Sequence, residues 1–248
     1  MANKLIFQEL AHRPWILPAG RWVMAQEWHD LLFAHWPVPA ERLRAHIPAG
    51  LELDTHEGQA WITVVPFLMS GVRLRYLPAV PGASEFPELN LRTYVKRGGK
   101  AGVWFFSLDA ANSLAVAVAR AWFHLPYFRA RMRCEELSGW IEYESERIHN
   151  GDPPAIFRGR YRGAGNAFRA KAGTLEHFLV ERYCLYSVNP GGQLLRGEIH
   201  HPPWDLRLAE AELTDNSIAN HVSGPLQGKP LLHFSRRQEV VAWAPQAV

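Results

Sequence analysis

Residues 88–109 read ELNLRTYVKRGGKAGVWFFSLD, and this stretch carries the clearest strand signal in the chain. Two runs rich in β-branched and aromatic residues flank the pair Gly98-Gly99. A two-residue hairpin turn requires positive φ angles, which glycine adopts without steric cost. The sequence therefore predicts an antiparallel hairpin of Glu88–Lys96 and Ala101–Asp109.

This turn also predicts which side chains of the hairpin share a face. It places Arg92 opposite Phe105 and Tyr94 opposite Val103, and facing residues lie on the same side of a sheet. One side is nearly all apolar and is expected to pack beneath helices: Leu89, Leu91, Thr93, Val95, Trp104, Phe106 and Leu108. The other side is mostly polar: Glu88, Asn90, Arg92, Tyr94, Phe105, Ser107 and Asp109. The assignment depends on register, because a slip of one residue exchanges the two faces.

Two locations are consistent with the polar side of the hairpin. In a half-buried sheet it faces water. In a closed barrel it lines the interior, where an arginine can bind a small anion and polar neighbours can orient it. On that reading the ligand-binding residues are Asn90, Arg92, Tyr94, Phe105 and Ser107, and Asp109 is a candidate for proton transfer.

The rest of the chain is also rich in short strands. Strands are predicted at 51–54, 60–68, 128–135, 139–148, 155–162, 182–188 and 194–201, with two or three more near the end of the chain. Helices are predicted over 39–47, over 112–124 and from Thr174, whose side chain offers an N-cap. About a dozen strands with few helices predict an α+β protein built on an antiparallel sheet or barrel. Without an internal repeat or long linker, residues 1–248 are expected to form one domain.

Charged residues alternate along three consecutive predicted strands. Because side chains alternate with a period of two, each set shares one face. The sets are Arg129, Arg131 and Arg133; Glu142, Glu144 and Glu146; and Arg158, Arg160 and Arg162. If the strands are neighbours, a glutamate row lies between two arginine rows on a solvated outer face. This interleaving argues against a nucleic-acid surface, which needs unpaired basic residues.

A second group of polar residues lies near the end of the chain. If 189–193 form a loop, Tyr186 faces Arg196, Cys184 faces Glu198 and Arg182 faces His200. Arg182 and Tyr186 are therefore further candidates for ligand binding, and Glu198 and His200 for proton transfer. A metal site is not predicted, because catalytic sites usually have three convergent ligands and no third is marked.

Arg120 lies near the end of the helix predicted over 112–124. It either reaches into a pocket or caps the helix C-terminus, where a cation is favoured.

Composition limits the classes of protein that remain. The 248 residues carry a formal net charge of +3 with only two cysteines, so neither a nucleic-acid footprint nor a disulfide framework is expected. The chain shows no signal peptide and no apolar run long enough to span a bilayer, so a cytoplasmic protein is expected. Motifs of nucleotide cofactors, serine hydrolases and zinc proteases are absent, and no cofactor is predicted.

Four segments in one order resemble the YqjF-like family of bacterial proteins, which is grouped with the acetoacetate decarboxylase-like superfamily. They are ELNLRTYV (88–95), GVWFFSLDA (102–110), LEHFLVERYCLY (175–186) and GEIHHPPW (197–204), and the likeness extends over about residues 25–240. The resemblance implies a single-domain antiparallel β-barrel or cone with a central cavity and a few peripheral helices. It implies no established reaction.

One departure from the decarboxylases concerns their catalytic lysine. Acetoacetate decarboxylase forms a Schiff base with a lysine whose pKa is lowered by an adjacent cation. The matching region, Ser107–Leu114, has no lysine, and the five lysines elsewhere lie in terminal or loop-like contexts, including Lys100 at the hairpin tip.

Two functions remain open. One is binding of a small carboxylate or carbonyl compound, and the other is a lyase or related enzyme that acts on a small keto acid by Asp, Glu or His proton transfer. A homo-oligomer is possible in either case.

Overall fold

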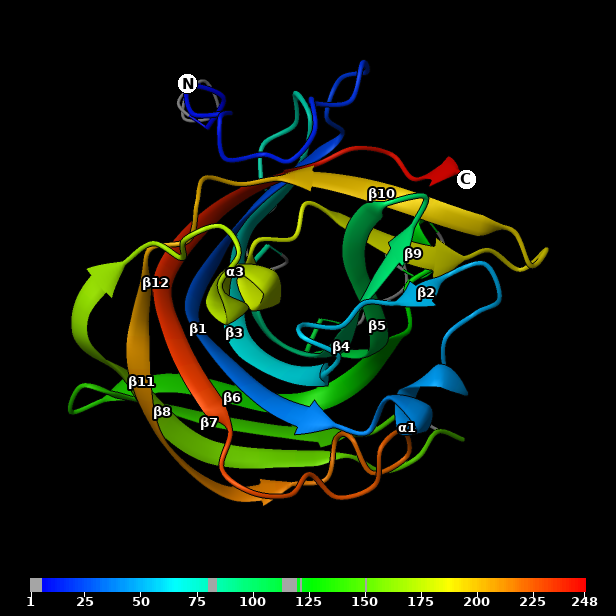
Figure 1. Ribbon diagram of the computed structural model, residues 1–248. Coiled ribbons are helices and arrows are strands. Elements are labelled where there is room, and N and C mark those ends of the chain that lie inside the picture. Colours follow the sequence, from blue (N-terminus) through cyan, green and yellow to red (C-terminus); the bar gives the residue numbers. More distant parts are fainter. Residues whose placement is uncertain (1–5, 80–83, 113–119, 121, 150) are drawn as a thin grey trace.

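A computed structural model describes residues 6–79, 84–112, 120, 122–149 and 151–248 of the chain. Within these residues strands dominate and the helices are short (Figure 1). In chain order the elements are β1 (Met24–Val38), α1 (Ala40–Arg44), β2 (Glu52–Leu53), β3 (Ala60–Leu74), β4 (Phe86–Arg97), β5 (Lys100–Ala110), β6 (Tyr127–Leu137), β7 (Trp140–Arg147), β8 (Ile156–Phe168), α3 (Leu175–Val180), β9 (Cys184–Val188), β10 (Leu194–His200), β11 (Leu206–Asn216), β12 (Leu231–Ala242) and β13 (Gln246–Ala247). None of the described helices is long and apolar enough to cross a membrane.

The strands form one sheet that closes on itself along two routes (Figure 1). The first ring runs β12-β1-β3-β4-β5-β9-β10 and closes where β10 pairs with β12. The second ring shares the segment β12-β1-β3-β4-β5 and returns through β6, β7, β8 and β11. Among the described strands, only the pairings of β5 with β6 and with β9 are parallel. The predicted α+β class with a mainly antiparallel, ring-like sheet is confirmed.

Both faces of the shared wall are buried, and alternate side chains enter two different cores. On β1, Leu31 and Phe33 pack inside the first ring, whereas Leu32 and Ala34 pack inside the second. The result is a continuous apolar run rather than polar–apolar alternation. This explains why the sequence pattern does not predict β1, although β1 is one of the longest strands.

The predicted hairpin is confirmed as the pair β4–β5. Arg97 pairs with Lys100 across the turn, and Gly98 and Gly99 have φ angles of 54° and 76°. The helix predicted over 112–124 lies largely outside the described residues, apart from the helical positions Arg120, Trp122 and Phe123.

Among the described residues, the apolar side of this hairpin packs mainly against strands, and not beneath helices as the sequence suggested. Leu89 and Leu91 of β4 share a core with Tyr143 of β7 and Phe157 of β8, to which the short helix α1 contributes Leu43. For the described residues the prediction was wrong, because strands of the second ring cover most of this face.

The alternating charged strands are neighbours, as predicted. Arg131 and Arg133 of β6 pair with Glu146 and Glu144 of β7, and Glu144 faces Arg158 of β8. The arginines of β8 form ion pairs with acidic residues of β11 as well, including Arg160 with Glu212 at 2.9 Å. These side chains are about half exposed, so the rows form a solvated outer face of the second ring.

Candidate functional site

Helix α3 lies inside the first ring (Figure 1). Its N-cap is Thr174, as predicted, and the Thr174 side chain accepts a hydrogen bond from the His177 amide. At its other end, the carbonyl oxygen of Leu179 accepts hydrogen bonds from Arg92 Nη2 at 3.2 Å and from the Tyr94 hydroxyl at 2.9 Å. Two side chains of β4 therefore hold the end of α3 within the ring.

Beside α3 the first ring encloses a cavity of about 110 Å³. A water molecule occupies about 30 Å³ in the liquid, so the cavity suits only a small ligand. Its apolar walls include Trp28, Phe33, Phe105 and Trp204. The polar residues that line it are Gln26, Glu88, Asn90, Arg92, Tyr127, Arg182 and His201.

Arg92 brings a positive charge into this cavity. Its side chain is 9% exposed, and burial lowers its pKa from 12.5, yet a guanidinium remains charged at neutral pH. Among the described residues no carboxylate lies within ion-pair distance of it, and its Nε atom has no hydrogen-bond partner. A buried charge without a counter-ion is costly, so this arrangement favours binding of an anion. The prediction that Arg92 points into the ring is confirmed.

Arg182 also lines the cavity, but its charge is already satisfied. Its Nη1 lies 2.7 Å from Asp54 Oδ2, and its Nε donates to the carbonyl oxygen of Phe178. We therefore expect Arg182 to shape the cavity, whereas Arg92 is the group available to a ligand.

Glu88 is the acidic residue of the cavity, and it was not among the predicted site residues. It accepts a hydrogen bond from the Tyr127 hydroxyl at 3.0 Å. Burial raises its pKa to about 8, against the effect of this hydrogen bond. The carboxyl group is therefore mostly protonated at neutral pH and can donate or accept a proton there. The sequence signal for Glu88 was its alternation with Asn90 and Arg92.

A β-bulge in β5 changes the predicted faces of the hairpin. Arg92 pairs with Phe105, but Leu91 pairs with Ser107, so Phe106 is an extra residue in β5. From Ser107 onward the side chains of β5 therefore point to the opposite face. Leu108 lines the cavity, whereas Ser107 is fully buried on the other side of the wall.

The prediction that Asp109 shares the cavity with Arg92 is therefore wrong. Asp109 is fully buried in an ion pair with Arg147, whose Nη2 lies 2.7 Å from Asp109 Oδ1 and whose Nε also donates to it. Burial raises the pKa of Asp109 to about 6, although Arg147 acts in the opposite direction. Asp109 belongs to the packing of the wall rather than to the cavity.

The predicted pairing of β9 with β10 is confirmed, but most of its polar residues face outward. Tyr186 and Glu198 lie on the outer face, while the alternate residues Leu185 and Ile199 line the cavity. Lys100 Nζ lies 2.5 Å from Glu198 Oε1. Lys100 is thus partly buried in an ion pair, contrary to its predicted place at an exposed hairpin tip.

The N-terminal segment covers this outer face. Arg13 Nη2 lies 3.7 Å from Glu198 Oε2, and Arg13 Nη1 lies 3.3 Å from His200 Nδ1. The other ring nitrogen of His200 lies 2.7 Å from a backbone oxygen of the segment, and burial lowers the His200 pKa to about 4. Glu198 and His200 are therefore occupied by contacts within the protein and lie outside the cavity.

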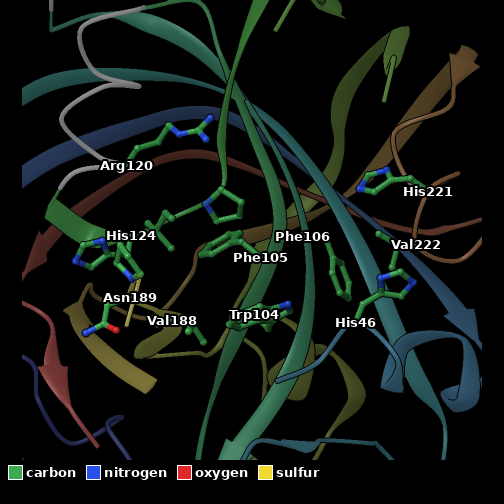
Figure 2. A pocket seen from close by; sticks show the side chains of 13 residues that line it. His46, Trp104, Phe105, Phe106, Arg120, His124, Val188, Asn189, His221 and Val222 are labelled. Carbon is green, nitrogen blue, oxygen red and sulfur yellow. The ribbon is translucent and has the colours of Figure 1, made fainter. Parts of the chain in front are cut away.

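Arg120 lines a different, open pocket of about 490 Å³ on the outside of the first ring (Figure 2). Figure 2 shows Arg120 and His124 at one end of this pocket and His46 and His221 at the other. Arg120 donates to the carbonyl oxygen of Tyr127 at 2.8 Å. Phe105 lines both this pocket and the cavity, but the structure separates Arg120 from the other predicted ligand-binding residues. Of those, Asn90, Arg92, Phe105 and Arg182 line the cavity, and Tyr94 lies beside it in the same core.

Comparison with known proteins identifies the family of this chain. The model of the DUF2071 family, described as an uncharacterized conserved protein, matches residues 25–239. The chain belongs to this family. It is 48% identical over 229 residues to the uncharacterized protein YqjF of Bacillus subtilis (strain 168), which covers 92% of this chain and 93% of the relative. The predicted resemblance to the YqjF-like family is confirmed.

Solved structures extend the likeness of fold to the acetoacetate decarboxylases. The acetoacetate decarboxylase of Legionella pneumophila superimposes with a TM-score of 0.63 at 12% identity, over 100% of this chain and 95% of that one. The enduracididine biosynthesis enzyme MppR complexed with pyruvate gives a TM-score of 0.63 at 11% identity, over 94% and 92%. At such low identity these likenesses show the acetoacetate decarboxylase-like fold alone.

The lysines that the structure describes lie outside the cavity. Lys100 is paired with Glu198 on the outer face, Lys96 lies 3.8 Å from Glu52, and Lys171 is exposed. An imine requires a desolvated, unprotonated amine beside the substrate, and the described residues place none in the cavity.

Proposed function

We propose that this protein binds a small carboxylate in the cavity of the first ring, with Arg92 as the group that holds the anion. The observation that carries the proposal is the buried Arg92 guanidinium, which lacks a carboxylate partner among the described residues and lines an otherwise largely apolar cavity. A bound carboxylate supplies the missing negative charge and accepts the free N–H. Binding then removes an electrostatic cost that the unliganded fold carries.

The size of the cavity and the fold both support this class of ligand. A volume of about 110 Å³ favours compounds of a few heavy atoms, such as short keto or hydroxy acids. One solved structure of the same fold is complexed with pyruvate, itself a small carboxylate. By analogy of fold, the same kind of compound is the first to test here.

A second candidate function is proton transfer to or from the bound acid. Glu88 favours it, because a buried carboxyl group with a pKa of about 8 can serve as a general acid near neutral pH. On this reading the role first given to Asp109, Glu198 and His200 belongs to Glu88, and the substrate is a small keto acid with acidic protons beside its carbonyl group.

The test is calorimetric titration with pyruvate, acetoacetate and the neutral ketone acetone. We expect both acids to bind and acetone not to bind. Arg92→Gln is expected to weaken binding of the acids about tenfold or more, because hydrogen bonds to charged groups contribute roughly 1.5–3 kcal/mol. Arg160→Gln, on the solvated outer face, is the matched control and should bind as the wild type does.

The same samples in D₂O distinguish binding from proton transfer. If Glu88 moves protons, the protein accelerates exchange of the pyruvate methyl protons, as seen by NMR, and Glu88→Gln removes the acceleration. Failure of both acids and of the corresponding hydroxy acids, lactate and 3-hydroxybutyrate, to bind at millimolar concentration would overturn the proposed function. Equal binding by Arg92→Gln and the wild type would also overturn it.

A further inference from the structure

Three buried polar atoms that lack a hydrogen-bond partner among the described residues belong to side chains of the cavity lining. They are Nε of Arg92, Oδ1 of Asn90 and Nε1 of Trp28. Buried polar atoms in folded proteins are almost always paired, so unpaired atoms need an explanation. Because these three belong to one cavity, the simplest explanation is that ligand atoms pair with them.

The orientation of the Asn90 amide determines what it offers to a ligand. Its Oδ1 atom is buried and has no hydrogen-bond partner among the described residues. The unpaired atom of this amide is therefore a hydrogen-bond acceptor, which a donor on a ligand can satisfy. Asn90 is 9% exposed, so Oδ1 has little access to bulk water. The cavity thus contains a fixed acceptor as well as donors.

Asn90 and Arg92 are close enough to act on one small molecule. They are two residues apart on the same face of β4, which separates their Cα atoms by about 6.6 Å. Both side chains line the same small cavity. A ligand that satisfies both must carry an acceptor for Arg92 and a donor for Asn90 within a few bonds of each other.

We infer that the preferred ligand is a small hydroxy acid, whose carboxylate accepts from Arg92 Nε while its hydroxyl group donates to Asn90 Oδ1. A keto acid meets the first requirement only, since its carbonyl oxygen would face the Asn90 oxygen without a proton between them. An amino acid would meet both, but its ammonium group would add a cation to a cavity that already holds Arg92, and the Glu88 carboxyl group there is mostly protonated at neutral pH. The inference rests on the proposed function, because it assumes that a carboxylate occupies the cavity.

The test compares matched pairs of acids that differ in this one group. Calorimetric titration uses pyruvate against each enantiomer of lactate, and acetoacetate against each enantiomer of 3-hydroxybutyrate. At least one hydroxy acid is expected to bind about tenfold more tightly than its keto partner, because a buried acceptor left unpaired by the keto acid costs affinity.

A variant of Asn90 assigns the preference to its side chain. Asn90→Leu should bind the hydroxy and keto acids of each pair equally, since it removes the acceptor at nearly unchanged volume. Asn216→Leu is the matched control, because Asn216 also has a buried unpartnered Oδ1 but is not part of the cavity lining, and it should keep the preference.

The outcomes separate this inference from the proposed function. Tighter or equal binding of the keto acids by the wild type overturns the hydroxy-acid inference and leaves carboxylate binding intact. Absence of binding by all of these acids overturns both. If Asn90→Leu does not fold, the comparison on the wild-type protein still decides the inference.

Discussion

The two faces of the β4–β5 hairpin each bury charged side chains, but the faces differ in whether the protein supplies an opposite charge. On the outer face Asp109 is paired with Arg147 through short hydrogen bonds, so the charge of each is balanced within the protein. On the inner face Arg92 lines the cavity and its Nε has no hydrogen-bond partner among the described residues, while Glu88 is held by a hydrogen bond from the neutral Tyr127 hydroxyl. Burial of a charge alone does not therefore mark a functional site. The informative feature is a buried polar group that the protein leaves unpaired beside an open space.

The largest loss of stability should follow from breaking the ion pair of Asp109 with Arg147. Asp109→Asn leaves the Arg147 guanidinium buried without its counter-charge, and removal of one partner of a buried ion pair typically costs about 3–5 kcal/mol. Urea unfolding of the variant should show a loss of this size, while the remaining folded protein binds carboxylates as the wild type does.

A double variant provides the control for this prediction. Asp109→Leu combined with Arg147→Met removes both charges, and we expect it to regain most of the stability lost by Asp109→Asn. If Asp109→Asn were as stable as the wild type but unable to bind carboxylates, the division between a structural outer face and a functional inner face would be wrong.

The same hairpin shows how much of the fold and of the site could be predicted from the sequence. The Gly98-Gly99 turn and the alternation from Glu88 to Tyr94 were enough to predict the hairpin and the inward direction of Arg92. The match of four ordered segments predicted the family and its fold. These signals are local, so they can be found without knowledge of the tertiary structure.

The errors came from features that local patterns do not encode. One extra residue at Phe106 moved Ser107 and Asp109 to the other face, and a β-bulge has no reliable signature in a single sequence. Closure of the second ring buried both faces of β1, which removed the alternation that marks a strand. The partners of Glu198 and His200 include Arg13, about 190 residues away in the chain, so their occupation could be seen only in the structure.

An intermediate effect on stability is expected at Glu88, and this effect depends on pH. Burial raises the Glu88 pKa to about 8 in the folded protein, above its ordinary value of 4.5, so between these values the folded protein holds a proton that the unfolded chain releases. The contribution of Glu88 to the free energy of unfolding is therefore fully present below about pH 4.5 and is lost as the pH rises towards 8. The free energy of unfolding should fall by up to about 1.4 kcal/mol per pH unit over this range from this group alone.

The comparison with Glu88→Gln isolates that contribution. The amide cannot ionise, so the difference in unfolding free energy between wild type and variant should shift in favour of the variant as the pH rises from 5 to 8. Other titrating groups, including Asp109, are common to both proteins and largely cancel. A difference that stays constant with pH would show that Glu88 ionises normally, and the cavity would then lose its candidate proton donor.

The smallest effect should come from the charged rows on the outside of the second ring. Glu144 lies 3.8 Å from Arg133 and faces Arg158 across β7–β8, and its side chain is 53% exposed. Exposed ion pairs contribute about 0–1 kcal/mol, since water solvates both partners and ordering the long side chains costs entropy. Glu144→Gln should therefore lower the free energy of urea unfolding by less than about 1 kcal/mol. The loss should shrink further in 1 M salt, where charges are screened within about 3 Å. A loss of several kcal/mol would mean that Glu144 is balanced as tightly as Asp109, and the contrast between buried and solvated charges on this sheet would not hold.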